Sequence, residues 1–317
     1  MDNWKSLLHQ DATDWLLEKT NPSVRYFTYR WLLDKAEDDP LIEATRQSIG
    51  ESQPVQKILQ QQRPAGYWGS DPQPHHGTKG PLMLLMWLGY RGDQAVKKAM
   101  DYRINGCLQK DGSYGLEIKG HTVFLPCHGA DLLRLMLWFG YTDDPRSLQL
   151  LNWLLSVQQS DGIWLCISKV KPFPCLWATA VVLRALREIP PTWLTPQVVK
   201  ARERTVDIFL NSSLYKYGKG KPSPRWFQFG FPLQWDTDIL EVLELIAPYV
   251  SPEDKGIQEG LDLVMQKQDK QGRWPCEKHP KGGKWIEKYL PLEEIGQPSK
   301  WVTLHVYRLL KTLYTER

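Results

Sequence analysis

A short turn sequence recurs four times along the chain, and any fold has to accommodate all four copies. Each copy contains a glutamine, a turn-forming glycine and an aromatic residue two positions after the glycine. The copies lie at residues 62–68, 109–114, 159–164 and 268–274. Glycine reaches the left-handed conformation that closes a helix, so each copy predicts a helix end that the aromatic side chain covers. The longer gap before the last copy predicts a degenerate copy at residues 217–226.

Two sets of prolines predict two kinds of helix between these turns. Proline suits the first helical position, because its fixed φ matches the helix and its missing N–H needs no partner there. The first set precedes amphipathic helices and comprises Asp39-Pro40, Asp144-Pro145, Thr195-Pro196 and Ser251-Pro252, with Asp93 capping the remaining copy. The second set precedes helices that are apolar on nearly every side and comprises Pro22, Pro81, Pro126, Pro174, Pro232 and Pro298. The pattern predicts amphipathic outer helices that alternate with buried inner helices.

This alternation predicts an all-α fold, a single (α/α)6 barrel of helical hairpin repeats. We favour a closed toroid over an open solenoid, because the last inner helix around Trp301 is as apolar as the middle ones and needs neighbours to cover it. No Gly/Ser linker interrupts the chain and no sustained alternation predicts a strand, so we expect one domain over residues 1–317. Residues 1–20 are expected to form a helical extension that packs on the barrel.

Composition excludes several classes of function. The 317 residues carry 40 basic and 36 acidic side chains without a basic stripe, so nucleic acid is not an expected partner. No apolar run is long enough for a transmembrane segment, whereas peripheral contact with a membrane surface is compatible with the sequence. The N-terminus lacks the features of a signal peptide, which favours a cytoplasmic protein with reduced cysteines. Nothing in the sequence fixes an oligomeric state.

The repeat of Gln, Gly and Trp between helical hairpins resembles the QW motif of the terpenoid cyclase and protein prenyltransferase superfamily. The resemblance covers about residues 20–315. Squalene-hopene cyclases have two such barrels, so this chain is most similar to a single-barrel class II terpene cyclase and is similar in size to the prenyltransferase β-subunit. The resemblance implies a hydrophobic isoprenoid substrate in a cavity lined by aromatic side chains. The content of 15 tryptophans is in keeping with such a cavity.

One segment carries a candidate acid. Residues 225–240 (RWFQFGFPLQWDTDIL) place several aromatic side chains directly before Asp236-Thr237-Asp238. Class II terpene cyclases use a D-x-D-D motif on an inner helix to protonate an alkene or epoxide, and the resemblance places Asp238 at the proton donor. Ile239 stands where the motif has its last Asp. Asp236 and His128 are the expected tuning partners, and the mechanism needs no cofactor. The expected cavity wall comprises Trp235, Phe231, Trp177, Phe124 and Trp301.

Two other functions stay open at this point. The starts of the inner helices share one rim in such a barrel, and that rim also holds a set of residues suited to a tetrahedral zinc ion. The set comprises Cys127, Cys175, His128 or His76, and Asp238. The remaining alternative is a non-catalytic toroid that binds an isoprenoid or a partner protein. Each candidate also has a structural interpretation, since an aspartate can cap a helix and a free cysteine packs as a small apolar residue.

Overall fold

The computed structural model describes residues 3–69, 77–118, 121–168, 171–218, 221–234 and 236–315. The chain is mostly helical with a few short strands, which confirms the all-α class and gives the element content of a toroid of helical hairpins. The α-helices are α1 (Thr13–Leu16), α2 (Pro22–Phe27), α3 (Pro40–Glu51), α4 (Gln53–Gln60), α5 (Lys79–Trp87), α6 (Gln94–Cys107), α7 (Pro126–Trp138), α8 (Pro145–Ser156), α9 (Leu176–Glu188), α10 (Pro196–Asn211), α11 (Ile239–Ile246), α12 (Lys255–Gln266) and α13 (Lys300–Tyr314). The shorter helical turns are η1 (Asn3–Leu7), η2 (Thr28–Leu32), η4 (Pro191–Trp193), η5 (Pro224–Phe227), η6 (Ala247–Tyr249) and η7 (Gly283–Lys288).

The strands form short antiparallel pairs that the sequence did not reveal. They are β1 (Gly115–Ile118) with β2 (His121–Phe124), β3 (Leu165–Ser168) with β4 (Lys171–Pro174), and β5 (Trp274–Pro275) with β6 (Pro298–Ser299). Strands of two to four residues are too short to show an alternating pattern. The strands β1, β3 and β5 follow the second, third and last copies of the turn sequence, so they extend the turns that the repeat predicts.

The residues divide into two compact units. Unit 1 comprises Met1–Gln56, Leu88–Tyr90 and Phe209–Arg317, and unit 2 comprises Lys57–Trp87 and Arg91–Ile208. The single domain expected over residues 1–317 stays a prediction. Each unit contains buried helices and amphipathic helices, so each has its own core.

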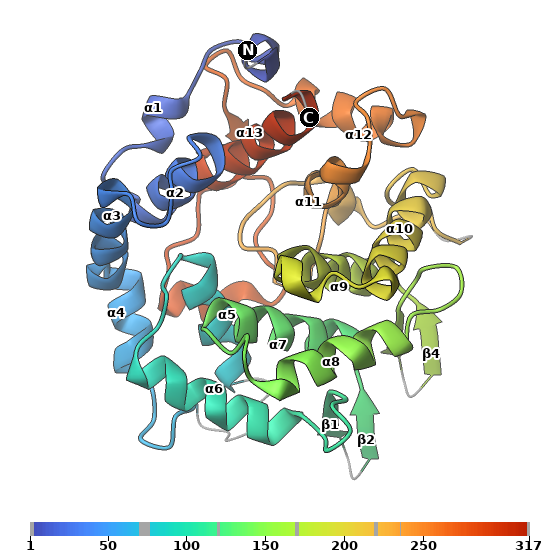
Figure 1. Cartoon of the computed structure of the whole chain (residues 1–317). Helices are drawn as coiled ribbons and strands as arrows, with labels where there is room; N and C mark the ends of the chain where they lie inside the picture. The colour runs from blue at the N-terminus through green and yellow to red at the C-terminus, as the bar shows by residue number, and fades with distance from the viewer. Residues whose placement is uncertain are drawn as a thin grey trace. The chain divides into compact units, whose positions relative to one another are not determined.

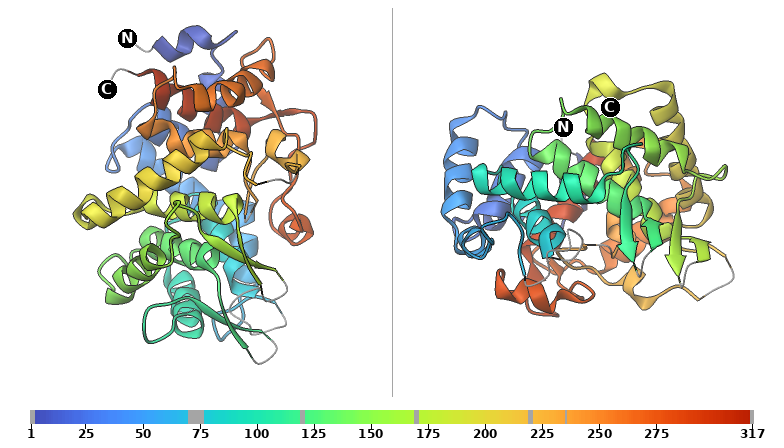
Figure 2. Two further views of the ribbon diagram at one scale, coloured as in Figure 1. Left: turned by 90° about the vertical axis from the view of Figure 1, so that its right-hand side faces the viewer. Right: turned by 90° about the horizontal axis from the view of Figure 1, so that it is seen from below.

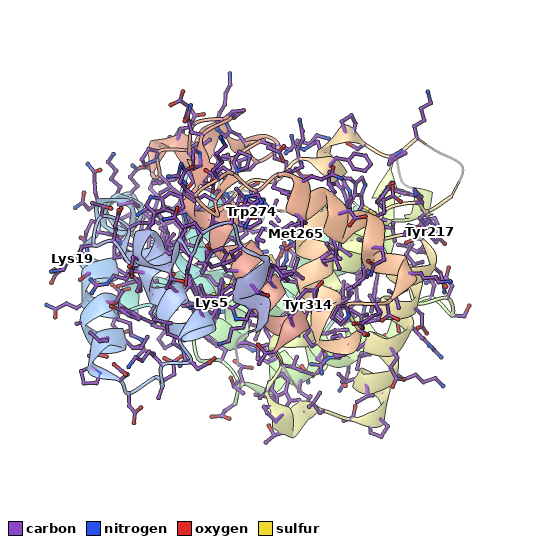
Figure 3. The ribbon with its side chains drawn as sticks, turned by 90° about the horizontal axis from the view of Figure 1, so that it is seen from above. Lys5, Lys19, Tyr217, Met265, Trp274 and Tyr314 are labelled. Carbon is purple, nitrogen blue, oxygen red and sulfur yellow. The ribbon has the colours of Figure 1, made fainter. Side chains whose placement is uncertain are left out.

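Helix α13 lies at the centre of the contacts in unit 1. It packs against α2, α11 and η1, and α2 packs in turn against α3 (Figure 1). The N-terminal residues are fixed to α13, because the ring of Trp4 lies 5.3 Å from that of Tyr307 and Ala12 N donates to Tyr307 Oη at 2.7 Å. Figure 3 labels Lys5 on η1 and Tyr314 on α13, the two neighbouring elements. The first turn of the chain is therefore part of the core of unit 1.

Helix α7 lies at the centre of the contacts in unit 2. It packs against α5, α8 and α9, and most of its residues are buried (Figure 1). The hairpins β1–β2 and β3–β4 extend from the same unit, directly before α7 and α9 (Figure 2). These two hairpins thus set the position at which the buried helices α7 and α9 begin.

The amphipathic helices begin at the predicted cap residues, with one exception. Asp39, Asp93 and Asp144 each accept a hydrogen bond from a backbone N–H in the first turn of the helix that follows, at 2.8, 3.0 and 2.9 Å. The exception is α12, which begins at Lys255 after Asp254, three residues beyond the expected start at Pro252. Ser251 N donates to Asp254 Oδ2 at 2.7 Å, so these residues form a turn of their own before the helix.

The tryptophans of the turn sequence are structural. Trp68, Trp164 and Trp274 are buried, and each donates its indole N–H to the carbonyl ten residues upstream, at 2.7, 2.8 and 2.6 Å. In the remaining copy Tyr114 is buried and its hydroxyl accepts from Arg103 instead, at 3.2 Å. Each aromatic ring thus ties its turn to the preceding helix, as expected from the sequence.

Glycines tie the first three turns to the next amphipathic helix, and glutamines do so at the first and third turns. Gln62 Nε2 donates to Gly66 O at 3.1 Å and to Ala95 O in α6 at 2.8 Å. At the third turn the equivalent bonds are made by Gln158, the residue directly before the predicted copy, to Gly162 O and to Ala201 O in α10, both at 3.0 Å. Because Gly66, Gly112 and Gly162 touch the backbone of the next amphipathic helix, a side chain at these positions would displace that helix. The repeat therefore encodes the packing of consecutive hairpins.

Candidate functional site

Asp238 begins the buried helix α11 in unit 1. Its Oδ1 accepts a hydrogen bond from Glu241 N at 2.9 Å, and the side chain of Thr237 donates to Glu241 Oε2 at 2.6 Å. Acidic side chains are favourable here, because the first backbone N–H groups of a helix lack partners and carry partial positive charge. Asp238 therefore has the capping role that the structural interpretation assigned to it. Its second oxygen, Oδ2, faces a different group.

The group that faces Asp238 Oδ2 is Lys278, a lysine from the loop between β5 and η7. Lys278 Nζ lies 3.2 Å from Asp238 Oδ2 and 3.8 Å from Asp236 Oδ2. It also donates to the carbonyls of Arg225 and Thr237, at 3.0 and 3.2 Å. Only 4% of Lys278 and 1% of each aspartate are exposed, so these charges interact with little screening by water.

Burial raises the pKa of Asp238 to about 6, since the charged carboxylate loses its hydration. The ammonium of Lys278 lowers this pKa, and so does the hydrogen bond from the backbone of Glu241. The result is a carboxyl group that carries a proton at mildly acidic pH and still has a cation beside it to stabilise the carboxylate. Such a group can donate a proton and hold the charge that remains.

Asp236 lies on the other side of Lys278 and pairs with a second cation. Arg225 Nε donates to Asp236 Oδ2 at 2.6 Å, and Arg225 Nη2 contacts the same oxygen. Asp236 Oδ1 is buried and has no hydrogen-bond partner among the residues that the structure describes. A buried carboxylate oxygen without a donor is costly, so this atom marks a place where a polar group of a ligand would be favourable.

An aromatic cluster lies in the same unit and consists of Phe27, Trp31, Phe231 and Trp301. The rings of Phe231 and Trp301 are stacked at 3.9 Å with an interplanar angle of 12°. Phe27 lies 6.1 Å from Trp301 and 4.5 Å from Trp31. The structure thus brings together two of the predicted wall residues, Phe231 and Trp301. It adds Trp31 from η2 and Phe27 from α2. Aromatic faces of this kind attract positive charge.

His305 borders this aromatic cluster and pairs with a buried carboxylate. Its ring lies 5.5 Å from Trp31 and 6.1 Å from Phe231, and its Nδ1 lies 2.7 Å from Glu244 Oε2. Arg308 donates to the other oxygen of Glu244 at 2.8 Å. Because Glu244 holds the proton on Nδ1, Nε2 is the basic nitrogen of His305.

The remaining predicted site residues belong to unit 2 or are not described. His128 Nδ1 lies 3.3 Å from Lys79 Nζ, so its role beside Asp238 stays a prediction. Phe124 is largely exposed on β2 and Trp177 is half-buried in α9, and their place in a cavity wall also stays a prediction. Trp235 and His76 lie outside the described residues.

The predicted zinc ligands do not form a recognisable metal site in the described structure. Cys127 and Cys175 are both half-buried in unit 2, whereas Asp238 belongs to unit 1. Over residues 3–315, apart from the short stretches that the structure leaves undescribed, no three His, Cys, Asp or Glu side chains are arranged to hold a metal ion. The zinc alternative stays a prediction.

Sequence reasoning missed Lys278, Glu244 and His305. Lys278 stands among lysines and glycines that are typical of a solvated loop, so nothing in its neighbourhood indicates that it is buried. Glu244 and His305 did leave a signal, because each is an ionisable residue that stands between two apolar residues within a helix. Buried ionisable groups of this kind are uncommon without a partner, and each of the two is the partner of the other.

Comparisons with known proteins gave a likeness of fold. No model of a protein family and no curated protein matches the sequence. Among solved structures, the chain is similar to a protein from Actinoplanes, with 14% identity and a TM-score of 0.47 over 93% of this chain and 90% of that one. It is similar to the type II terpene cyclase MstE from Scytonema, with 14% identity and a TM-score of 0.45 over 92% and 87% of the two chains.

A variant of MstE in complex with geranylgeranyl dihydroxybenzoate, its substrate, gives a similar result. The identity is 14% and the TM-score 0.45, over 85% of this chain and 82% of that one. At this identity the chemistry has to be argued from the residues of this chain. No helix in the described ranges is both long and apolar enough to cross a membrane.

Proposed function

We propose that this protein is a terpenoid cyclase-like enzyme of the class II type, which cyclises a hydrophobic isoprenoid by protonating it. The observation that carries the proposal is the buried carboxyl of Asp238, whose pKa burial raises to about 6. An acid in this state is protonated at mildly acidic pH and has no water around it to compete for its proton. The aromatic cluster of the same unit supports the proposal, because it supplies π faces for a cationic intermediate.

Asp238 is the proton donor in this mechanism. The proton on Oδ2 moves to one carbon of a terminal alkene, or to the oxygen of an epoxide, and leaves a carbocation on the substrate. The electron pair of the next double bond then forms a carbon–carbon bond and moves the positive charge along the chain. Lys278 assists as a positioning residue, since its ammonium stabilises the carboxylate that Asp238 becomes. No cofactor takes part in this step.

His305 is the proton acceptor that ends the reaction. A final carbocation becomes neutral when it loses a proton from the adjacent carbon, and the imidazole Nε2 takes that proton. Glu244 stabilises the resulting imidazolium ion, because its carboxylate lies 2.7 Å from Nδ1. Asp238 and Glu244 lie at the start and in the last turn of α11, and six residues of helix span about 9 Å.

The proposal is tested with linear isoprenoids of several chain lengths, each with a terminal alkene or an epoxide. The purified protein is incubated with each substrate in D₂O at pD near 6, and products are identified by mass spectrometry. We expect a cyclic product with one deuterium at the initiating position, which Asp238→Asn abolishes and Asp144→Asn retains. Asp144 caps α8 in unit 2 and serves as the matched control.

Two results would contradict the proposal. One is a cyclic product that Asp238→Asn forms as fast as the wild type. The other is saturable binding of an isoprenoid without turnover of any substrate between pH 5 and 8, which would make the protein a non-catalytic binding toroid.

A further inference from the structure

The buried helix α7 of unit 2 carries two charged side chains in its middle, Asp131 and Arg134. They stand three positions apart in the sequence, so they lie one turn apart on the same face of the helix. Only 1% of Asp131 and 7% of Arg134 are exposed. Charged side chains are almost never buried to this degree unless they are paired, so every polar atom of the two residues needs a partner.

Each of these two residues has an ion-pair partner on a neighbouring buried helix. Lys79, the first residue of α5, pairs with Asp131 Oδ2. Glu188, the last residue of α9, accepts hydrogen bonds from Arg134 Nε at 2.9 Å and from Arg134 Nη2 at 2.6 Å. Both α5 and α9 pack against α7 (Figure 1). We call these four residues the α7 charge cluster, and its two positive and two negative charges balance.

The ion pairs leave one polar atom of each buried residue unused. Asp131 Oδ1 and Arg134 Nη1 are both buried, and neither has a hydrogen-bond partner in the part of the chain that the structure describes. The carboxylate oxygen can only accept a hydrogen bond, and the guanidinium nitrogen can only donate one. Leaving such atoms unpaired costs free energy, most of all for charged groups. The two atoms therefore favour a ligand group that both donates and accepts.

Charge and surroundings restrict the ligand further. A charged ligand would leave one charge uncompensated in a buried cluster that is neutral without it, which is costly. The residues around the cluster are apolar, because Leu132, Leu133 and Leu135 stand next to the two charged positions and α5 is apolar and buried from Pro81 to Met86. A ligand that combines a neutral polar group with an apolar body suits these surroundings.

We propose that the α7 charge cluster binds the hydroxyl group of a neutral aliphatic alcohol. The hydroxyl donates to Asp131 Oδ1 and accepts from Arg134 Nη1, and the alkyl chain lies against the apolar side chains of α5 and α7. Lys79 and Glu188 hold the carboxylate and the guanidinium in place, so both atoms are oriented before the alcohol arrives. This proposal is independent of the acid Asp238, which belongs to unit 1.

A water molecule is the competing occupant of this site. Water also donates and accepts hydrogen bonds, and it can enter beside Lys79, whose side chain is 14% exposed. An alcohol forms the same two hydrogen bonds and in addition removes its alkyl chain from water. The affinity of straight-chain alcohols should therefore rise by about fourfold for each added methylene, as long as the chain is buried.

The test compares the binding of 1-octanol and of its methyl ether to the full-length protein by isothermal titration calorimetry at pH 7. We expect one molecule of 1-octanol per chain, bound at least about tenfold tighter than the ether. The ether cannot donate a hydrogen bond, so it would leave the charged Asp131 Oδ1 buried without a donor. Neither probe has a double bond or an epoxide, so the result does not depend on any cyclase activity.

A double variant tests whether the α7 charge cluster causes this preference. Lys79→Met with Asp131→Leu replaces a buried ion pair with apolar side chains, a change that proteins often tolerate. We expect this variant to bind the alcohol and the ether with equal affinity. Lys97→Met with Asp101→Leu is the matched control, because it removes an exposed ion pair of α6 in the same unit and should retain the preference of the wild type. Circular dichroism shows whether each variant is folded.

A measurement on the wild type locates the site even if the double variant fails to fold. A long-chain alcohol that carries a diazirine should crosslink to α5, α7 or α9 under light, and an excess of 1-octanol should suppress the crosslinks. Three results would overturn the proposal: equal affinity for 1-octanol and its ether in the wild type, crosslinks confined to other elements, or no saturable binding of any alcohol, which would leave water as the occupant.

Discussion

Lys278 Nζ lies 3.2 Å from Asp238 Oδ2, and neither side chain is exposed to solvent to a significant degree. The lysine is fixed independently of Asp238, since it also donates to the carbonyls of Arg225 and Thr237. Its charge therefore stays in place when Asp238 gains or loses its proton. Two opposite effects therefore determine the pKa of Asp238: burial raises it and Lys278 lowers it.

The raised pKa of Asp238 predicts how activity depends on pH. The reactive form is the protonated acid, so the rate should fall as pH rises through about 6. The measurement is kcat/KM for cyclisation from pH 5 to 8, with binding of an unreactive saturated analogue at each pH as the control. A rate that rises through this range would contradict the role of Asp238 as acid.

Replacing Lys278 with methionine should move this dependence to higher pH. Methionine fills a similar volume without charge, so the pKa of Asp238 would no longer be lowered by the ammonium and the midpoint should lie above that of the wild type. The maximal rate at low pH should fall, because the carboxylate product loses its cation. Lys216→Met is the control, since Lys216 pairs with Glu259 on the exposed surface. A midpoint that stays near 6 would show that Lys278 has no influence on the acid.

The free energy of unfolding should also depend on pH, because of the raised pKa of Asp238. Asp238 binds its proton more tightly in the folded chain than in the unfolded chain, where its pKa is near the ordinary value of 3.8. Its contribution to stability is therefore fully present below pH 4 and lost as pH rises through about 6. A shift of about two pKa units corresponds to about 3 kcal/mol.

Urea unfolding at several pH values measures this contribution. The difference in free energy of unfolding between the wild type and Asp238→Asn should decrease by about 3 kcal/mol from pH 4 to 7. Asp144→Asn should show the opposite sign, because the pKa of Asp144 is lowered by its hydrogen bonds with Arg146 and its contribution is lost as pH falls. A constant difference for Asp238→Asn would mean that its pKa does not change on folding.

His305→Phe should alter the products more than the rate. Phenylalanine can keep the contacts with Trp31 and Phe231 but cannot accept a proton, so the initiating protonation is retained and the final deprotonation is not. We expect substrate consumption within about tenfold of the wild type, with more alcohols from capture of water and more alkene isomers. Gas chromatography of the product mixture measures this, and His9→Phe on the N-terminal segment is the control. An unchanged mixture would remove His305 from the mechanism.

The features that the sequence predicted correctly are those set by short-range physics. The caps at Asp39, Asp93 and Asp144 involve residues two or three positions apart, and the tryptophan in three of the four turns bonds a carbonyl ten residues upstream. Such contacts require a fixed spacing between residues, and this spacing is visible in the sequence. Its repetition predicted the helical hairpins. The paired strands are too short to produce a recognisable pattern.

The candidate site was only partly predictable for the same reason. The aromatic residues before Asp236 and Asp238 form a visible local pattern, and one of them, Phe231, stacks on Trp301, while their place in a cavity wall stays a prediction. Lys278 lies 40 residues from Asp238 in the chain, and its burial depends on how its loop folds back over α11.

Two glycines of unit 2 should differ in their tolerance of alanine, although both have positive φ. Gly162 has a φ of 95° and its missing Cβ would collide with Arg204 O in α10, whereas Gly140 has a φ of 85° and open space around it. Gly140→Ala should cost only the strain of the left-handed backbone, about 1 kcal/mol. Gly162→Ala should cost about 3 kcal/mol or more, because α10 would also have to move away from the turn. Equal losses in urea unfolding would mean that the close approach of turn and helix, and hence the repeat itself, contributes little to the fold.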